Sequence, residues 1–391
     1  MTQVQAPPAQ AGVARTGSPT RLGGRRRRGR IGPLAVGQIV VVEVGLVAVG
    51  VTLGRPVWLV AIVATVAVLA VGAVFVRRRG RWWYEDLGLR RRLRQRARRA
   101  ATAKPSADDP RLSALAPDLT LTDVLDRGSR FGVGQDDHGW FLACVVAPES
   151  SDPTEPVEAS TVDRAVEVLA GYTGPGSSAQ VVARTLVRAA EPGVPAELVR
   201  DVWVALRLSV PDARVEAVNR GGGIPGVHRT MAAAAGRLGK ALTGAGLAYQ
   251  VLDRDELRAT ILDATGLDLV DVPQVETWKG LTGGGLTQLC LSLRSRSDLS
   301  YGELVDAVTA VPVVSHTLSV TVGGGGPVGA PLLRVAAGDS EIARFAGTVG
   351  EVVGRHSVTS RPLDGRHGPA VYASAPVAAE RPTTGVGPIR V

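Results

Sequence analysis

Residues 34–76 read LAVGQIVVVEVGLVAVGVTLGRPVWLVAIVATVAVLAVGAVFV, and this stretch decides how the chain is organised. It holds two apolar runs, Leu34–Leu53 and Pro56–Val76, each close to the roughly 20 residues that an α-helix needs to span a bilayer. Only Gly54 and Arg55 separate the runs, and a continuous helix would be broken by the proline that opens the second run. The stretch therefore predicts a tight transmembrane helical hairpin with spans 34–53 and 56–76.

The charge around this hairpin is strongly asymmetric. Arginines crowd both outer flanks, whereas the connecting loop contains only Arg55. Because basic flanks stay on the cytoplasmic side, we expect a multi-pass protein of the cell inner membrane with both termini in the cytoplasm. The same flanks predict anionic lipids as a partner, at about 1 kcal/mol per basic residue near the surface. The flanking arginines are Arg25, Arg26, Arg27, Arg28, Arg30, Arg77, Arg78, Arg79, Arg81 and the seven between Arg90 and Arg99.

The rest of the chain has the opposite charge. Residues 1–100 contain 19 arginines and three acidic residues, so in a chain of net charge +9 the remaining residues carry −7. An acidic domain is a poor partner for nucleic acid, and none is expected. Cys144 and Cys290 lie in separate apolar runs without metal-ligand spacing, which favours two buried free thiols.

Four residues are candidates for membrane anchoring or for an interface in the membrane. Trp82, Trp83 and Tyr84 follow the second span, where amphipathic rings sit at the headgroup level. Glu43 lies near the middle of the first span, where a carboxylate is costly. Two interpretations of Glu43 stay open: contact with another helix or a polar pathway, or a protonated side chain bonded within the hairpin, for example to Gln38.

The sequence divides into five parts. They are a disordered basic arm at 1–30, the hairpin at 31–87, a basic juxtamembrane helix and linker at 88–110, a cytoplasmic α/β domain at 111–375 and a disordered tail at 376–391.

The periodicity of the large domain predicts a mixed α/β sheet. We expect a β-hairpin over 131–146 with its turn at Asp136–Gly139, and neighbouring strands at 179–187 and 202–208. Further strands are predicted at 248–252, 286–293, 314–322 and 370–374. Helices are predicted at 161–170, 211–219, 227–243, 255–264, 302–311 and 342–353.

Asp253-Arg254-Asp255 has two interpretations. An Asp-x-Asp after a strand is how many nucleotide-sugar glycosyltransferases hold a divalent metal. The same residues, followed by Glu256, have the spacing of a helix capping box, which is the interpretation we favour.

Other motifs carry no assigned chemistry. The glycines of 282–285 and 323–329 lack the Lys-Ser/Thr ending of a phosphate loop. Arg220-Gly221-Gly222-Gly223 predicts a helix C-cap and turn, with an anion site at the next helix N-terminus as the alternative. The five histidines have no paired spacing, so no catalytic residue, cofactor site or metal site is predicted.

Taken together, several segments resemble the EccE family, a membrane core component of the type VII (ESX) secretion system of actinobacteria. The resemblance covers roughly residues 30–375. The segments are the Arg-rich arm, Gly37-Gln38-Ile39-Val40 in the first span, Arg78-Arg79-Gly80-Arg81-Trp82-Trp83-Tyr84-Glu85 before an Arg-rich helix, Gly132-Val133-Gly134 and Gly139-Trp140 of the hairpin, Arg220-Gly221-Gly222-Gly223, and Leu252-Asp253.

The resemblance implies a non-catalytic structural subunit for protein export that assembles with EccB, EccC and EccD, in which EccC supplies the ATPase. It also implies an α/β soluble domain similar to glycosyltransferase-like folds. The alternative function is therefore a membrane-anchored enzyme of glycosyltransferase type that uses Asp253 and Asp255, although fold likeness does not establish chemistry.

Overall fold

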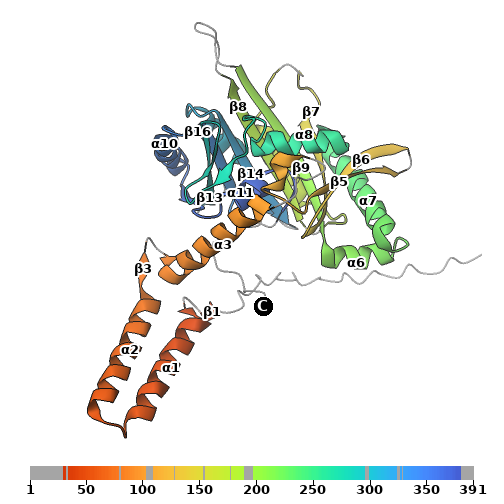
Figure 1. Cartoon of the computed structure of the whole chain (residues 1–391). Helices are drawn as coiled ribbons and strands as arrows, with labels where there is room; N and C mark the ends of the chain where they lie inside the picture. The colour runs from red at the N-terminus through yellow and green to blue at the C-terminus, as the bar shows by residue number, and fades with distance from the viewer. Residues whose placement is uncertain are drawn as a thin grey trace, which may run out of the picture. The chain divides into compact units, whose positions relative to one another are not determined.

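The computed structural model divides the chain into two compact units. One unit comprises residues 1–84 with 387–391, and the other comprises residues 85–386 (Figure 1). The structure describes residues 30–31, 34–78, 81–102, 109–126, 128–152, 155–176, 178–188, 197–295, 299–323, 326–327 and 329–379. The predicted basic arm, apart from its last residue, and the predicted tail from residue 380 onward lie outside the described residues.

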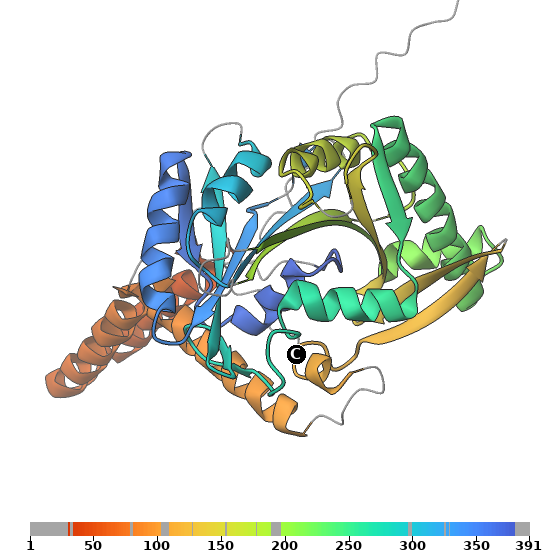
Figure 2. The ribbon, with the colours of Figure 1, turned by 90° about the horizontal axis from the view of Figure 1, so that it is seen from above.

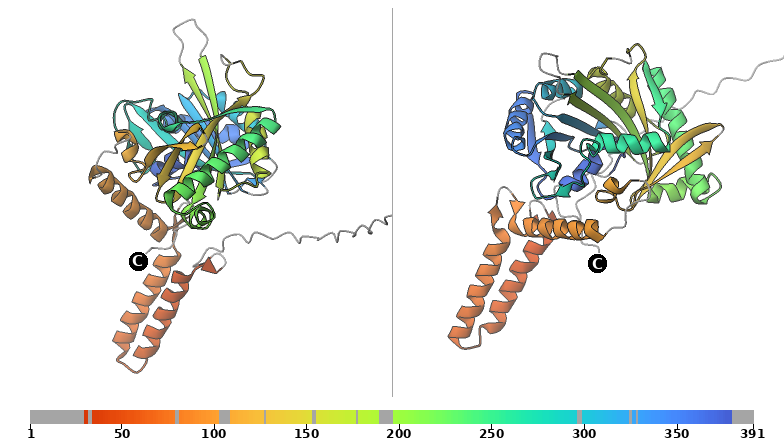
Figure 3. Two further views of the ribbon diagram at one scale, coloured as in Figure 1. Left: turned by 90° about the vertical axis from the view of Figure 1, so that its right-hand side faces the viewer. Right: turned by 45° about the horizontal axis from the view of Figure 1, so that its top comes forward.

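The first unit contains two apolar helices that lie side by side (Figures 1 and 3). They are α1 (Val36–Thr52) and α2 (Val57–Phe75), joined by a short turn. The Gln38 side-chain amide donates to the Val74 carbonyl at 3.3 Å. A Cβ added to Gly45 would lie 3.5 Å from the Cβ of Ala67, an ordinary van der Waals contact, so the two helices are close here but the spacing does not require a glycine. Two-residue strands flank the pair: β1 (Arg30–Ile31) with β2 (Leu34–Ala35), and β3 (Arg77–Arg78) with β4 (Arg81–Trp82).

Among the residues that the structure describes, only the second helix is long and apolar enough to cross a membrane by itself. α2 has 19 residues and a mean hydropathy of 2.7. α1 has 17 residues, which at 1.5 Å per residue is about 26 Å and falls short of the roughly 30 Å hydrocarbon core. The predicted pair of helices is present, but the predicted pair of spans, 34–53 and 56–76, is not confirmed.

The second unit is built on one large sheet in which every described pair of neighbouring strands is antiparallel. The strand order is β11-β12-β13-β16-β14-β8-β9-β7-β6-β5, with β10 beside β7, β15 beside β14 and β17 beside β13. The strands are β5 (Thr120–Asp126), β6 (Ser129–Asp136), β7 (Gly139–Pro148), β8 (Ser178–Arg188), β9 (Glu197–Ser209), β10 (Leu247–Val251), β11 (Val275–Glu276), β12 (Leu281–Gly283), β13 (Leu286–Ser295), β14 (Ser315–Gly323), β15 (Gly326–Pro327), β16 (Leu332–Gly338) and β17 (Val358–Pro362).

Helices cover both faces of this sheet. Figure 2 shows the sheet curving around α8 and α11, with other helices on its outer face. The outer core contains residues of α5, α6, α7, α9 and α10, and the inner core contains residues of α8 and α11. The helices are α3 (Trp83–Thr102), α4 (Pro110–Ser113), α5 (Ser160–Ala170), α6 (Val210–Val218), α7 (Gly223–Gly244), α8 (Arg254–Thr265), α9 (Tyr301–Thr309), α10 (Ile342–Arg355) and α11 (His367–Ser374).

Strand alternation explains the two cores. On β8, Val181 and Ala183 enter the outer core, while Val182 enters the inner core. On α10, Phe345, Val349 and Val353 recur every fourth residue and are buried against the outer face. Burying each such Val or Phe side chain stabilises the fold by about 1.5–3 kcal/mol. The mixed α/β class is confirmed, whereas a glycosyltransferase-like fold is not established by this topology.

Most predicted elements are confirmed, and two predictions at the C-terminal end are wrong. The hairpin is present, with Asp136 paired to Gly139 across its turn. Residues 370–374 were predicted as a strand but belong to helix α11. The prediction failed because the periodicity of a short apolar run does not distinguish a strand from a helix. The predicted tail starts too early, since Val377 and Ala378 are buried in the inner core.

Candidate functional site

The Asp-x-Asp motif caps helix α8. One carboxylate oxygen of Asp253 accepts hydrogen bonds from the backbone N–H groups of Asp255 and Glu256, both at 2.9 Å. The Glu256 carboxylate accepts from the Asp253 backbone N–H at 2.9 Å. Two unsatisfied donors of the helix end are thereby paired reciprocally, which confirms the capping box.

The second carboxylate of the motif contributes little to the site. The Asp255 side chain is 67% exposed and lies 3.7 Å from the Arg254 guanidinium. Within the described residues, no group of three or more His, Cys, Asp or Glu side chains could hold a metal ion. Asp253 and Asp255 are therefore arranged as a helix start, and the described residues do not join them with further ligands.

The Arg220-Gly221-Gly222-Gly223 segment forms the predicted turn between α6 and α7. The three glycines have φ angles of 93°, 73° and 59°, a left-handed conformation that other residues rarely adopt. The Gly222 N–H donates to the Ala217 carbonyl at 2.7 Å, so one of the backbone carbonyls at the C-terminus of α6 has a hydrogen-bond donor. The C-cap and turn are confirmed, and an anion site at the N-terminus of α7 remains an untested alternative.

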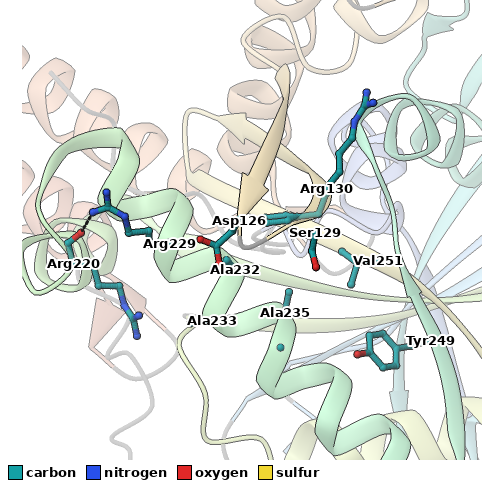
Figure 4. Close-up of a pocket in the computed structure, with 12 residues that line it drawn as sticks. Asp126, Ser129, Arg130, Arg220, Arg229, Ala232, Ala233, Ala235, Tyr249 and Val251 are labelled. Atoms are coloured by element: carbon teal, nitrogen blue, oxygen red, sulfur yellow. Dashed lines mark hydrogen bonds between the residues drawn. The ribbon is translucent and has the colours of Figure 1, made fainter.

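A pocket of about 640 Å³ opens beside this turn (Figure 4). Its walls come from the β5–β6 hairpin, from helix α7 and from strand β10. Tyr249 and Val251 point into it from β10 (Figure 4). The lining residues are Asp126, Ser129, Arg130, Phe131, Arg220, Arg229, Ala232, Ala233, Ala235, Gly236, Tyr249 and Val251.

The pocket is basic, and two of its three arginines are held in place. A guanidinium N–H of Arg229 donates to the Arg220 carbonyl at 2.6 Å. Arg130 pairs with Asp123 at 2.5 Å, and this contact lowers the pKa of the Asp123 carboxyl. The Arg220 guanidinium makes no hydrogen bond or ion pair with the residues that the structure describes. Against these three cations the lining offers the single carboxylate of Asp126.

The predicted juxtamembrane helix, α3, packs against other residues of the second unit. In α3, Leu89 is 3% exposed. Both Arg96–Glu276 hydrogen bonds measure 2.8 Å, and Arg96 also donates to the Gly365 carbonyl at 2.7 Å. The Arg90 guanidinium lies 5.0 Å from the centre of the Trp278 ring, a cation–π contact. Five arginines of this helix are exposed, namely Arg90, Arg91, Arg94, Arg98 and Arg99.

The four predicted anchor residues fall at two places in the chain. Glu43 is exposed on α1 and makes no hydrogen bond or ion pair with the described residues, so the bond to Gln38 is not found there. Trp82 ends β4, and Trp83 and Tyr84 begin α3.

A buried polar network escaped the sequence analysis. The Arg207 guanidinium binds the Asp136 carboxylate at 2.6 and 2.8 Å, and the Tyr372 hydroxyl donates to the same carboxylate at 2.8 Å. Burial opposes ionisation of Asp136, but Arg207 outweighs it and the pKa of the carboxyl is lowered. Arg207 also donates to the Val377 carbonyl at 3.0 Å, which fixes the chain beyond α11.

A second buried arginine closes the other end of α8. Arg334 is 1% exposed and donates to the carbonyls of Ala264 and Thr265 at the C-terminus of α8. Burial lowers the pKa of Arg334 to about 10. The sequence did contain a signal for these buried contacts: Arg207 and Arg334 each lie inside an apolar strand run. A charged side chain in a strand buried on both faces needs hydrogen-bond partners in the protein interior.

Residues 196–293 match the family model described as "EccE: Putative type VII ESX secretion system translocon". The predicted resemblance to EccE is confirmed. The EccE match covers about a quarter of the chain and runs through β9, α6, α7, β10 and α8 into β13. It implies a component of a type VII secretion system, and it contains the capping box and most of the pocket walls. No curated protein matches the chain.

Proposed function

We propose that the chain is a non-catalytic structural subunit of a type VII secretion membrane complex, assembling with EccB, the EccC ATPase and EccD. The observation that carries the proposal is the EccE match over residues 196–293. The bonding of Asp253 supports the non-catalytic part, because its side chain accepts two hydrogen bonds from backbone groups of its own helix. The buried Arg334 at the end of α8 is likewise used for structure.

Attachment to the inner membrane is proposed through both helices of the first unit, with both termini in the cytoplasm. The apolar α2, the adjacent α1 and the arginine-rich flanks support this topology. Reporter fusions at Arg99 and after Val391 should be active only as cytoplasmic reporters. Periplasmic-type activity of the second fusion would refute the topology.

Glu43 is proposed as a contact to another membrane helix of the complex. Its carboxyl is exposed on α1, away from partners within the described chain, and an isolated carboxyl at bilayer depth needs a polar partner. Glu43→Leu should weaken assembly while Glu43→Gln, which keeps a polar group, should retain more of it. Equal assembly by both variants and the parent chain would contradict this role.

Trp82, Trp83 and Tyr84 are proposed to anchor the chain at the inner interface. Replacing both tryptophans with Ala should loosen membrane attachment and assembly without unfolding the second unit. If thermal unfolding of the second unit shifts and membrane attachment does not, the tryptophans stabilise the fold instead. The exposed arginines of α3 supply the proposed lipid contact, at about 1 kcal/mol each.

Affinity purification of the tagged full chain from membranes in mild detergent tests the central proposal. EccB, EccC and EccD should copurify with the parent chain and equally with Asp253→Asn and Asp255→Asn. Metal-dependent binding of a nucleotide sugar that is lost in both variants, without copurification of secretion subunits, would overturn the structural-subunit assignment and favour the glycosyltransferase alternative.

A further inference from the structure

Strands β6 and β10 meet at one point and then separate. The Gly132 N–H donates to the Leu252 carbonyl at 2.7 Å, where the two strands come together. β6 pairs with β7 only over Gly134–Asp136, so its first half has a partner on one side alone, strand β5. β10 pairs with β7 only, among the described strands. We call the space between these two strands the β6–β10 wedge, and the pocket of Figure 4 occupies it.

The outer edge of β10 has backbone groups available for pairing. The Leu252 N–H donates to the Ala143 carbonyl at 3.1 Å, and the Glu149 N–H donates to the Gly246 carbonyl at 3.3 Å. Because backbone groups alternate sides along a strand, the even-numbered residues of β10 face β7 and the odd-numbered residues face away from it. Tyr249 and Val251 therefore present their N–H and C=O groups at an unpaired edge, the kind of edge to which a further strand adds.

The α7 surface at the bottom of the wedge consists of small apolar residues. Helix α7 contributes Ala232, Ala233, Ala235 and Gly236 to the lining. A Cβ added to Gly236 would meet no atom within 4 Å, so space lies above this part of the helix. Side chains of moderate size could pack there beside Val251. A ligand with charged groups and no apolar groups would leave this surface uncovered.

The rim of the wedge is basic. Its lining contains three arginines, Arg130, Arg220 and Arg229, and a single acidic residue, Asp126. Arg220 is the one of the three whose guanidinium has no partner among the described residues. An occupant with carboxylates at this rim would gain charge-assisted hydrogen bonds.

We propose that the β6–β10 wedge binds an extended acidic segment of a partner protein. The segment adds as a strand to the edge of β10, lays apolar side chains on the small residues of α7 and places acidic side chains farther along the same face, beside Arg220 and Arg229 at the start of α7. Strand addition of this kind draws its affinity from main-chain hydrogen bonds and its specificity from every second side chain. This surface belongs to the second unit, and its role does not depend on the identity of the secretion partners.

Binding of a fluorescently labelled peptide, in which every second residue is valine in one half and glutamate in the other, to the detergent-solubilised full chain tests the proposal by fluorescence anisotropy. Arg220→Glu should weaken binding by about tenfold, a change of about 1.4 kcal/mol. Arg214→Glu, an exposed arginine of α6 outside the pocket lining, is the matched control and should stay within about twofold of the parent chain. Gly236→Leu should block the wedge, while Gly236→Ala should not.

Two further binding experiments identify the kind of ligand. N-methylation of alternate peptide amides should abolish binding without altering the charge of the probe, because the methyl groups remove the donors that pair with β10. The melting midpoint of each variant reports whether the chain is folded. The proposal is overturned if the unmodified peptide does not bind, if the N-methylated peptide binds equally well, or if Arg220→Glu and Arg214→Glu behave alike. Preferential, Arg220-dependent binding of inorganic phosphate or of phosphatidylglycerol vesicles would also overturn it in favour of a small-anion or lipid site.

Discussion

Substitutions of Asp253 distinguish two roles of this residue, a helix cap and a metal ligand. Asp253→Ala removes the side-chain acceptor of two backbone hydrogen bonds of 2.9 Å, from Asp255 and Glu256. The bond from the Asp253 backbone N–H to the Glu256 carboxylate remains, because it uses no side-chain atom of residue 253. The first turn of α8 therefore loses half of its capping box.

The expected cost follows from that count. Loss of an N-cap acceptor destabilises a protein by about 1 kcal/mol. α8 cannot fray cheaply to escape this cost, because Leu257 and Ile261 are fully buried in the inner core. For a unit of this size, about 1 kcal/mol corresponds to a fall of roughly 2 °C in the melting midpoint. Asp253→Asn and Asp253→Ser keep an oxygen acceptor and should stay within about 0.5 kcal/mol of the parent chain.

Thermal unfolding of the full chain in detergent, measured in parallel with secretion, checks this prediction. Ala should lower the midpoint, Asn and Ser should not, and secretion should persist in all three. Asp255→Asn serves as the matched control, because its side chain is exposed and only offers favourable charge to the helix start. The capping argument fails if Asn destabilises as much as Ala, or if Asn at either position abolishes function while the midpoint is unchanged.

Two further predictions concern stability. Arg96→Leu should cost about 2 kcal/mol by leaving the mostly buried Glu276 carboxylate without its charge-assisted partner, whereas Arg94→Leu on the same helix should be nearly neutral, as urea titration can measure. Burial lowers the pKa of His316 to about 3 and of His367 to about 4, from an ordinary 6.5. The unfolded chain therefore takes up protons that the folded chain does not, so the melting midpoint should fall as the pH drops from 6.5 toward 4, and a flat profile over that range would contradict neutral burial of the two rings.

The local sequence pattern was sufficient to predict those elements that are determined by residues close together in the chain. The hairpin turn at Asp136–Gly139 and the cap at Asp253 are determined by short-range spacing, and both are present. The neighbours β8 and β9 were also predicted correctly, since each is a long apolar run with β-branched residues.

Long-range contacts explain the predictions that failed. Residues 370–374 could be strand or helix by pattern, and helix α11 is favoured by contacts from distant segments, including the Glu276 carboxylate that accepts from the Gly368 N–H at 3.0 Å. Val377 and Ala378 read as tail because small apolar residues near a terminus give no periodic signal. Their burial depends on hydrogen bonds from Arg207 to Val377 and from Ala378 to Gln180, which no local window contains.

The pocket was missed for the same reason, although its parts were visible. Arg220 was noted beside its glycines, whereas Arg130 and Tyr249 come from other segments and gave no signal of their own. Only the placement of β10 beside β7 brings these residues to one space. A site assembled from a turn, a hairpin and an edge strand cannot be read from spacing along the chain.

The helix cap and the wedge are physically continuous. A Cβ added to Gly132 would lie 2.6 Å from the carbonyl oxygen of Asp253, closer than real Cβ contacts allow, so β6 can cross the start of α8 only as glycine. At this crossing the Gly132 N–H holds the Leu252 carbonyl, one residue before the cap. The junction of β10 with α8 thus displaces β6 from β7 and opens the wedge at its apex. Because Arg334 fixes the far end of α8, the apex rests on a helix held at both ends. The Asp-x-Asp motif therefore supports the wedge through the position of α8, and its carboxylates need no chemistry of their own to affect what binds there.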